Sequence, residues 1–79
     1  MDKITMNLQP DVDDYDVHRV QQAIHDMDHS DELTITIEAA DAHEADPIIN
    51  LLKEYGFDHQ IKGSQDGKSI YINARRKLH

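Results

Sequence analysis

Apolar residues return at every second position in residues 3–8, 33–39 and 70–75, and a shorter alternation of His59, Ile61 and Gly63 with Gln60 and Lys62 precedes the last of these stretches. This period of two is typical of a β-strand that buries one face and leaves the other in solvent. Asp66 and Gly67 lie between the last two stretches and favour a tight hairpin there. The pattern predicts a sheet that is covered on one side only, because the polar positions of each strand share the opposite face.

A helical period replaces this alternation after the first predicted strand. The apolar stripe of this first helix is Val17, Val20, Ile24 and Met27. Asp13, Asp14 or Asp16 can cap the first N–H groups of the helix and complement its dipole.

A second helical stripe follows the second predicted strand, and it consists of Ile48, Leu51, Leu52 and Tyr55. Two starts compete for this helix, because Asp41 and Glu44 have capping-box spacing while Asp46 stands directly before Pro47. We expect an irregular first turn from about Asp41 and a regular helix from Pro47. Gly56 stands where a left-handed residue ends a helix, and Phe57 can pack back onto the last turn.

The element order β-α-β-α-β-β predicts one domain over residues 1–79, an α/β two-layer sandwich. We expect a four-stranded mixed sheet with both helices on one face, since a β-α-β unit makes a right-handed crossover between parallel strands. The predicted core is Ile4, Met6, Leu8, Val20, Ile24, Met27, Leu33, Ile35, Ile37, Ile48, Leu51, Leu52, Ile61, Ile70 and Ile72. The predicted solvent face of the sheet carries Thr5, Asn7, Thr34, Thr36, Glu38, Lys62, Tyr71, Asn73 and Arg75.

Composition excludes several kinds of chemistry. The 79 residues include no cysteine, so the chain has no disulfide, no thiol nucleophile and no Cys-based zinc site. No run of apolar residues is long enough to span a membrane, and the first five residues lack the apolar stretch of a secretory signal. We therefore expect a cytoplasmic, non-catalytic domain without a cofactor.

Charge is divided unevenly along the chain. The net charge is −8, with −12 in residues 1–58 and +4 in residues 59–79. A surface with this much negative charge repels the phosphates of nucleic acids over most of its area, so we expect no DNA binding. An RNA-binding or ribosome-binding role would have to use the basic C-terminal segment, with Lys62, Lys68, Tyr71, Arg75, Arg76 and Lys77.

The helix stripe, the turn 30–32, the strand 33–39 and the positions of Asp41 and Pro47 resemble the TusA or SirA-like family of small sulfur carriers. The resemblance runs from about Leu8 to Lys77 and implies the same β-α-β-α-β-β fold. That family uses a Cys-Pro-x-Pro motif at the start of its first helix, where the cysteine becomes a persulfide. Here the motif falls on residues 13–16, which read Asp-Asp-Tyr-Asp. Because a carboxylate cannot carry a persulfide sulfur, this chain by itself cannot relay sulfur.

Three functional hypotheses remain. The first is a protein-binding adaptor or regulator whose candidate surface comprises Asp13, Tyr15, Lys62, Tyr71, Asn73 and Arg75. The second is the RNA-binding module, which the similarity of the element order to the C-terminal domain of bacterial translation initiation factor three also suggests. The third is a metal-binding module through His25 and His29, which have the i, i+4 spacing of two ligands on a helix.

Overall fold

The order of secondary-structure elements in the computed structural model, which describes residues 3–8, 12–28 and 30–77, is the predicted β-α-β-α-β-β. A 3₁₀-helix, η1, precedes the second α-helix. The elements are β1 (Lys3–Asn7), α1 (Asp14–Asp26), β2 (Glu32–Glu38), η1 (Ala39–Ala45), α2 (Asp46–Glu54), β3 (Phe57–Gly63) and β4 (Ser69–Arg76).

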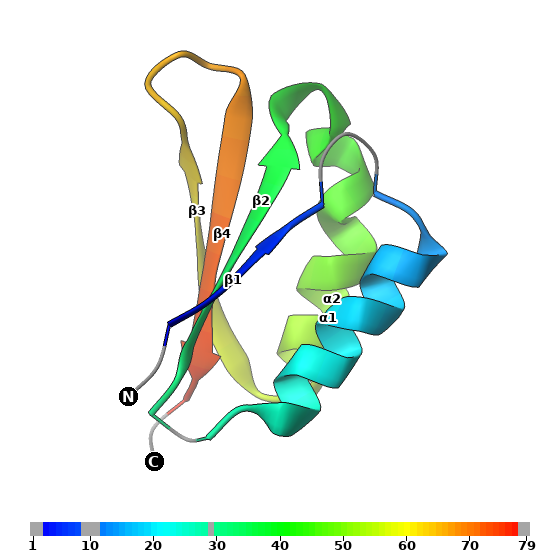
Figure 1. Cartoon of the computed structure of the whole chain (residues 1–79), viewed down its shortest axis with the longest axis vertical. Coiled ribbons are helices and arrows are strands. Elements are labelled where there is room, and N and C mark those ends of the chain that lie inside the picture. Colours follow the sequence, from blue (N-terminus) through cyan, green and yellow to red (C-terminus); the bar gives the residue numbers. More distant parts are fainter. Residues whose placement is uncertain (1–2, 9–11, 29, 78–79) are drawn as a thin grey trace.

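The four strands form one mixed sheet in the order β1-β2-β4-β3. β1 and β2 are parallel, whereas β4 is antiparallel to both β2 and β3. Both helices lie on one side of this sheet (Figure 1), which confirms the predicted two-layer sandwich. Among the described residues, no helix is both long enough and apolar enough to cross a bilayer.

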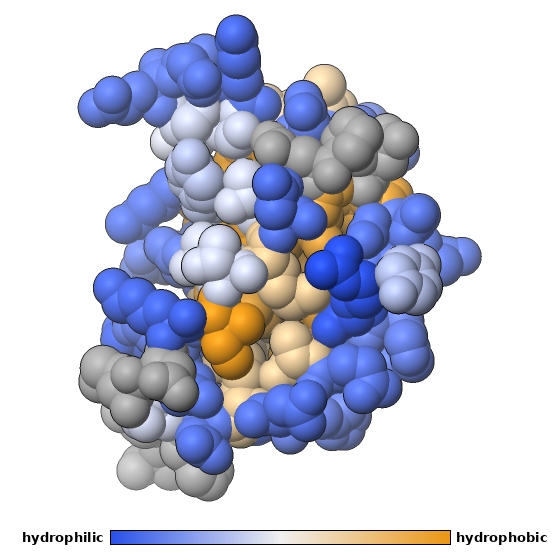
Figure 2. Space-filling model, viewed as in Figure 1, coloured by the Kyte–Doolittle hydropathy of each residue, from blue (hydrophilic) through white to orange (hydrophobic). Residues whose placement is uncertain are grey.

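The hydrophobic core fills the space between the sheet and the helices. Figure 2 shows apolar side chains between the two layers and hydrophilic side chains on the outside. The buried apolar residues are Met6, Leu8, Val20, Ile24, Met27, Leu33, Ile35, Ile37, Ala45, Ile48, Leu52, Phe57, Ile72 and Ala74. Ile4, Leu51 and Ile70 are partly buried against them, so the predicted core is largely confirmed.

The prediction for Ile61 is wrong, because half of this residue is exposed. Ile61 pairs with the fully buried Ile72 of the central strand β4, so it does face the helix layer. It lies on the edge strand β3, however, and the helices do not cover it there. Phe57, at the other end of β3, takes the place of Ile61 in the core.

The predicted irregular turn followed by a regular helix is confirmed to within two residues, but the predicted side-chain caps are wrong. The irregular segment is η1, which begins at Ala39, and neither η1 nor α2 has a side-chain cap. Asp41 and Asp46 therefore do not cap these helices. Asp41 lies inside η1, and Asp46 is the first residue of α2, where η1 runs directly into α2 and its turns can supply carbonyl partners for the first N–H groups of α2. Gly56 has a φ of 75°, which confirms the left-handed helix end.

Arg76 joins the last strand to the first helix. Its Nη2 donates to the carbonyl of Ile24 over 3.2 Å, and its guanidinium lies 5.0 Å from the centre of the Phe57 ring. A cation at this position complements the negative end of the α1 dipole. This one side chain therefore holds α1, β3 and β4 together.

Candidate functional site

The side of the sheet away from the helices is a polar surface that we call the open face. The strand register arranges it in three cross-strand rows. These rows are Lys3–Glu32–Arg75–Asp58, Thr5–Thr34–Asn73–Gln60 and Asn7–Thr36–Tyr71–Lys62. Glu38 continues the same face of β2, so every residue predicted for the solvent face lies on it.

The first row alternates in charge across all four strands, from Lys3 through Glu32 and Arg75 to Asp58. Arg75 Nη1 lies 3.9 Å from Glu32 Oε1, and Lys77 Nζ lies 3.8 Å from Asp58 Oδ1. The four side chains of these two ion pairs are between 40% and 73% exposed. Ion pairs so long and so exposed contribute little to stability, typically below about 1 kcal/mol.

The other two rows place neutral polar groups and one aromatic ring at the centre of the sheet. Thr34 Oγ1 donates to Asn73 Oδ1 over 2.8 Å, linking β2 to β4. Tyr71 lies between Thr36 and Lys62 and is 36% exposed. A partly exposed tyrosine combines apolar contact area with a polar tip, and such residues are enriched where proteins bind one another.

A shallow hollow of about 510 Å³ lies at one end of the open face. All four strands contribute to it, β1 and β3 through Lys3 and Asp58, and β2 and β4 through Thr34 and Asn73. Because it is open and polar, the hollow resembles a docking surface more than an enclosed pocket for a small apolar molecule.

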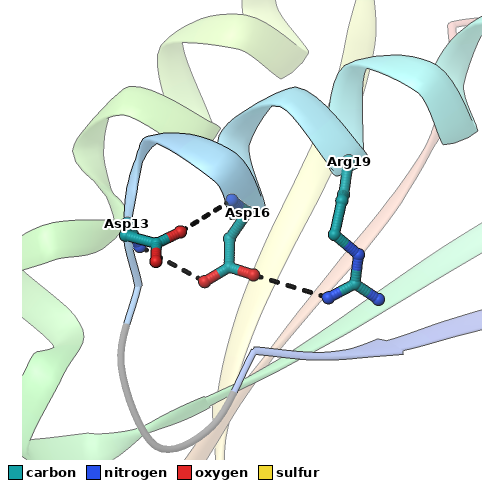
Figure 3. A network of polar contacts seen from close by, with 3 residues as sticks. All are labelled: Asp13, Asp16 and Arg19. Atoms are coloured by element: carbon teal, nitrogen blue, oxygen red, sulfur yellow. Dashed lines mark hydrogen bonds and ion pairs between the residues drawn. The ribbon is translucent and has the colours of Figure 1, made fainter.

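The first turn of α1 holds the remaining two predicted adaptor residues, Asp13 and Tyr15. Asp13 is the N-cap, and its Oδ1 accepts from the N–H of Asp16 over 2.9 Å. Asp16 in turn accepts from the N–H of Asp13 and from Arg19 Nη1, at 3.2 Å and 3.4 Å (Figure 3). The predicted cap is thus confirmed for Asp13, whose carboxylate is engaged locally. Tyr15 is 70% exposed, but it lies in the helix layer, away from the open face.

The six residues of the RNA hypothesis do not form one patch. Arg76 faces the helices, where it contacts Ile24 and Phe57. Lys68 lies in the turn between β3 and β4. Lys62, Tyr71 and Arg75 share the open face, with Lys77 just beyond the end of β4, but Arg75 and Lys77 face carboxylates there.

The histidines proposed as metal ligands cannot be compared as a pair, because His29 lies outside the described residues. His25 Nε2 lies 3.3 Å from the hydroxyl of Tyr55, and Gln21 Nε2 donates to the same hydroxyl over 3.1 Å. Within the described ranges, no three His, Asp or Glu side chains gather around a common point.

Sequence reasoning missed four residues of the open face, Lys3, Glu32, Asp58 and Gln60. The signal for Gln60 was present, since it alternates with His59 and Ile61 in the printed sequence. Asp58 was missed because β3 begins at Phe57, two residues before the predicted strand. The charge alternation of the first row needs the strand order, which no local pattern contains.

The fold and this surface define a two-layer α/β domain that has one covered and one open sheet face. No protein-family model, curated protein or solved structure matches the chain.

Proposed function

We propose that the chain is a TusA-like domain without sulfur-carrier chemistry, which acts as an adaptor or regulator by binding a protein through the open face. The single observation that carries the proposal is the composition of that face. It combines charges of both signs with the partly exposed ring of Tyr71. This mixture suits a protein surface better than a polyanion.

The ion pairs of the open face are weak enough to be replaced by ion pairs with a partner protein. Arg75 and Glu32, like Lys77 and Asp58, are separated by nearly 4 Å and are largely in water. Their mutual attraction is small, so a partner that offers a carboxylate to Arg75 or a cation to Glu32 loses little by replacing the existing pair. Complementary charges of this kind set the orientation and the association rate of a complex.

The first turn of α1 supports the non-catalytic part of the proposal. In the TusA resemblance, Asp13 occupies the position of the sulfur-carrying cysteine, and the chain has no cysteine elsewhere. The carboxylate of Asp13 caps α1 instead. A carboxylate that accepts a hydrogen bond from an N–H of the first turn stabilises the helix. The chain has no thiol nucleophile for sulfur transfer.

Affinity capture from a lysate of the native host, with and without RNase, tests the proposal when three forms of the chain are compared. These are the unchanged chain, the double variant Tyr71→Ala/Arg75→Glu, and Tyr15→Ala as the control. We expect a protein that survives RNase, is retained by the unchanged chain and the control, and is lost from the double variant. A captured protein that ignores the double variant would place binding elsewhere. Loss of all captured proteins on RNase treatment would favour the RNA hypothesis.

A further inference from the structure

The outer edge of β3 is a second surface with its own chemistry, distinct from the open face. β3 pairs with β4 on one side, and no other described element pairs with it on the opposite side. It runs for seven residues without proline. An edge of this kind presents a row of N–H and C=O groups that can pair with another strand.

The hydrogen bonds at the two ends of the hairpin identify which groups point outward. The N–H of Lys77 donates to the carbonyl of Gly56, and the N–H of Ser64 donates to the carbonyl of Ser69. Residues with even numbers in β3 therefore direct their backbone groups toward β4, because hydrogen-bonded pairs alternate along an antiparallel ladder. The groups that point away from β4 belong to Phe57, His59, Ile61 and Gly63.

We propose that β3 pairs with β3 of a second copy of this chain, antiparallel and with the two-fold axis at Gln60. Phe57 then lies opposite Gly63 of the second copy, and His59 lies opposite Ile61. All of these residues have outward-pointing backbone groups, so each such pair exchanges two hydrogen bonds. The whole length of β3 is paired, and the two sheets become one continuous sheet around a two-fold axis.

Charge complementarity favours this partner and this register. Pairing about Gln60 places Asp58 opposite Lys62 of the second copy, and Lys62 opposite its Asp58. These are non-hydrogen-bonded pairs, whose side chains approach most closely in an antiparallel ladder. Each new pair also extends the alternating first row of the open face, because Asp58 already lies beside Arg75.

Registers with the axis at His59 or at Ile61 lose the pairing of Asp58 with Lys62. Moving the axis to Lys62 or to Asp58 sets two like charges directly opposite each other, which destabilises an antiparallel pair. The exposed residue Ile61 also gains cover in the proposed register, since it lies opposite His59 of the second copy on the helix side. The other edge strand, β1, offers no such match: pairing about Thr5 would set Lys3 opposite Asn7.

A charge-reversal experiment tests the proposal by sedimentation equilibrium from micromolar to millimolar chain concentration. We expect the unchanged chain to dimerise and Asp58→Lys and Lys62→Asp each to raise the dissociation constant at least about tenfold, because each homodimer then faces like charges. An equimolar mixture of the two variants should regain dimerisation, since both cross-strand pairs of the heterodimer are again opposite in charge. Circular dichroism checks that the variants remain folded.

A cysteine cross-link tests the register directly, because the natural chain has no cysteine. Gln60→Cys places two thiols opposite each other at the two-fold axis, within the range that a disulfide can bridge. Mild oxidation should cross-link Gln60→Cys rapidly, whereas Thr5→Cys, at the centre of the other edge strand, should remain monomeric on the gel.

Three outcomes would overturn the proposal. The unchanged chain could remain a monomer at millimolar concentration. A dimer could persist in both charge variants with no response to mixing. A dimer could form while Gln60→Cys cross-links no faster than Thr5→Cys. If a dimer persists in both charge variants, Ile61→Pro shows whether it uses the β3 edge, because proline removes an outward N–H of β3 and leaves the ladder to β4 intact. A dimer that survives this change does not use the β3 edge.

Discussion

The two sides of the sheet differ in both charge and packing. On the covered side, the helices α1, η1 and α2 carry seven acids against only Arg19 and Lys53. On the open face, three acids of the strands meet three bases, Lys3, Lys62 and Arg75. The helices therefore carry −5 of the net charge of −8, whereas the charges on the face that we propose for binding cancel.

The net charge of a segment of the chain does not predict the charge of a face of the folded domain. The segment 1–58 is strongly acidic and the segment 59–79 is basic, yet β1 and β2 come from the first segment and β4 from the second. The sheet places strands of both segments side by side. Glu32 thereby meets Arg75, and the open face is close to neutral.

The largest expected difference in the free energy of unfolding is between variants of two consecutive residues of β4, Ile72 and Asn73, which point to opposite sides of the sheet. Ile72→Ala should lower the free energy of unfolding by about 2–5 kcal/mol, because Ile72 is fully buried and a cavity would remain. Asn73→Ala should lower it by only about 0.5–1.5 kcal/mol, through loss of the hydrogen bond from Thr34. Urea denaturation measures both, and equal losses would contradict the division into a packed side and an open side.

The neighbouring arginines Arg75 and Arg76 of β4 also point to opposite sides of the sheet. Arg76→Ala should lower the free energy of unfolding by about 1–3 kcal/mol, because it removes a charged hydrogen bond to Ile24 and the contact with Phe57. Arg75→Ala, the control on the open face, should lower it by less than about 1 kcal/mol, since its ion pair with Glu32 is exposed. Thermal unfolding of the two variants compares them, and a more damaging Arg75→Ala would reverse our assignment of roles.

A smaller effect is expected at the start of α1, within the acidic helix layer. Asp13→Ala should lower the free energy of unfolding by about 1 kcal/mol, through loss of the side-chain cap. Asp14→Ala leaves the cap in place and should have an effect below about 0.5 kcal/mol, because Asp14 only complements the helix dipole. If urea denaturation finds the two changes equal, the acids of this turn act by charge alone.

The smallest effect concerns the β3–β4 turn, which belongs to neither side. Asp66 accepts from Ser64 Oγ and from the N–H of Lys68, and these bonds lower the pKa of its carboxyl below 3.8. A lowered pKa in the folded state stabilises the fold above pH 3.8, and this contribution is lost as the pH falls through the lowered pKa. The melting temperature of Asp66→Asn should therefore lie slightly below that of the unchanged chain at pH 6, and the gap should close in strong acid. A gap independent of pH would contradict the role of the carboxylate.

Much of the fold could be predicted from local patterns. The period of two placed each strand and identified the buried and open positions of β2 and β4, because alternation needs no knowledge of neighbouring strands. The capping role of Asp13 and the left-handed end at Gly56 were also predictable, since both depend on residues within one turn. The candidate site was predicted only in part, because the first row of the open face combines residues from four strands.

Local patterns in the sequence established the period of each element, the side of the sheet that most strand residues face and the absence of a thiol. The tertiary structure places β3 at an edge of the sheet, so that Ile61 is exposed while its partner Ile72 is buried. It also decided that Arg76 reaches the end of α1 while Arg75 meets Glu32. The physical reason is that alternation assigns a residue to a face, whereas burial and charge pairing depend on which strands become neighbours across the sheet.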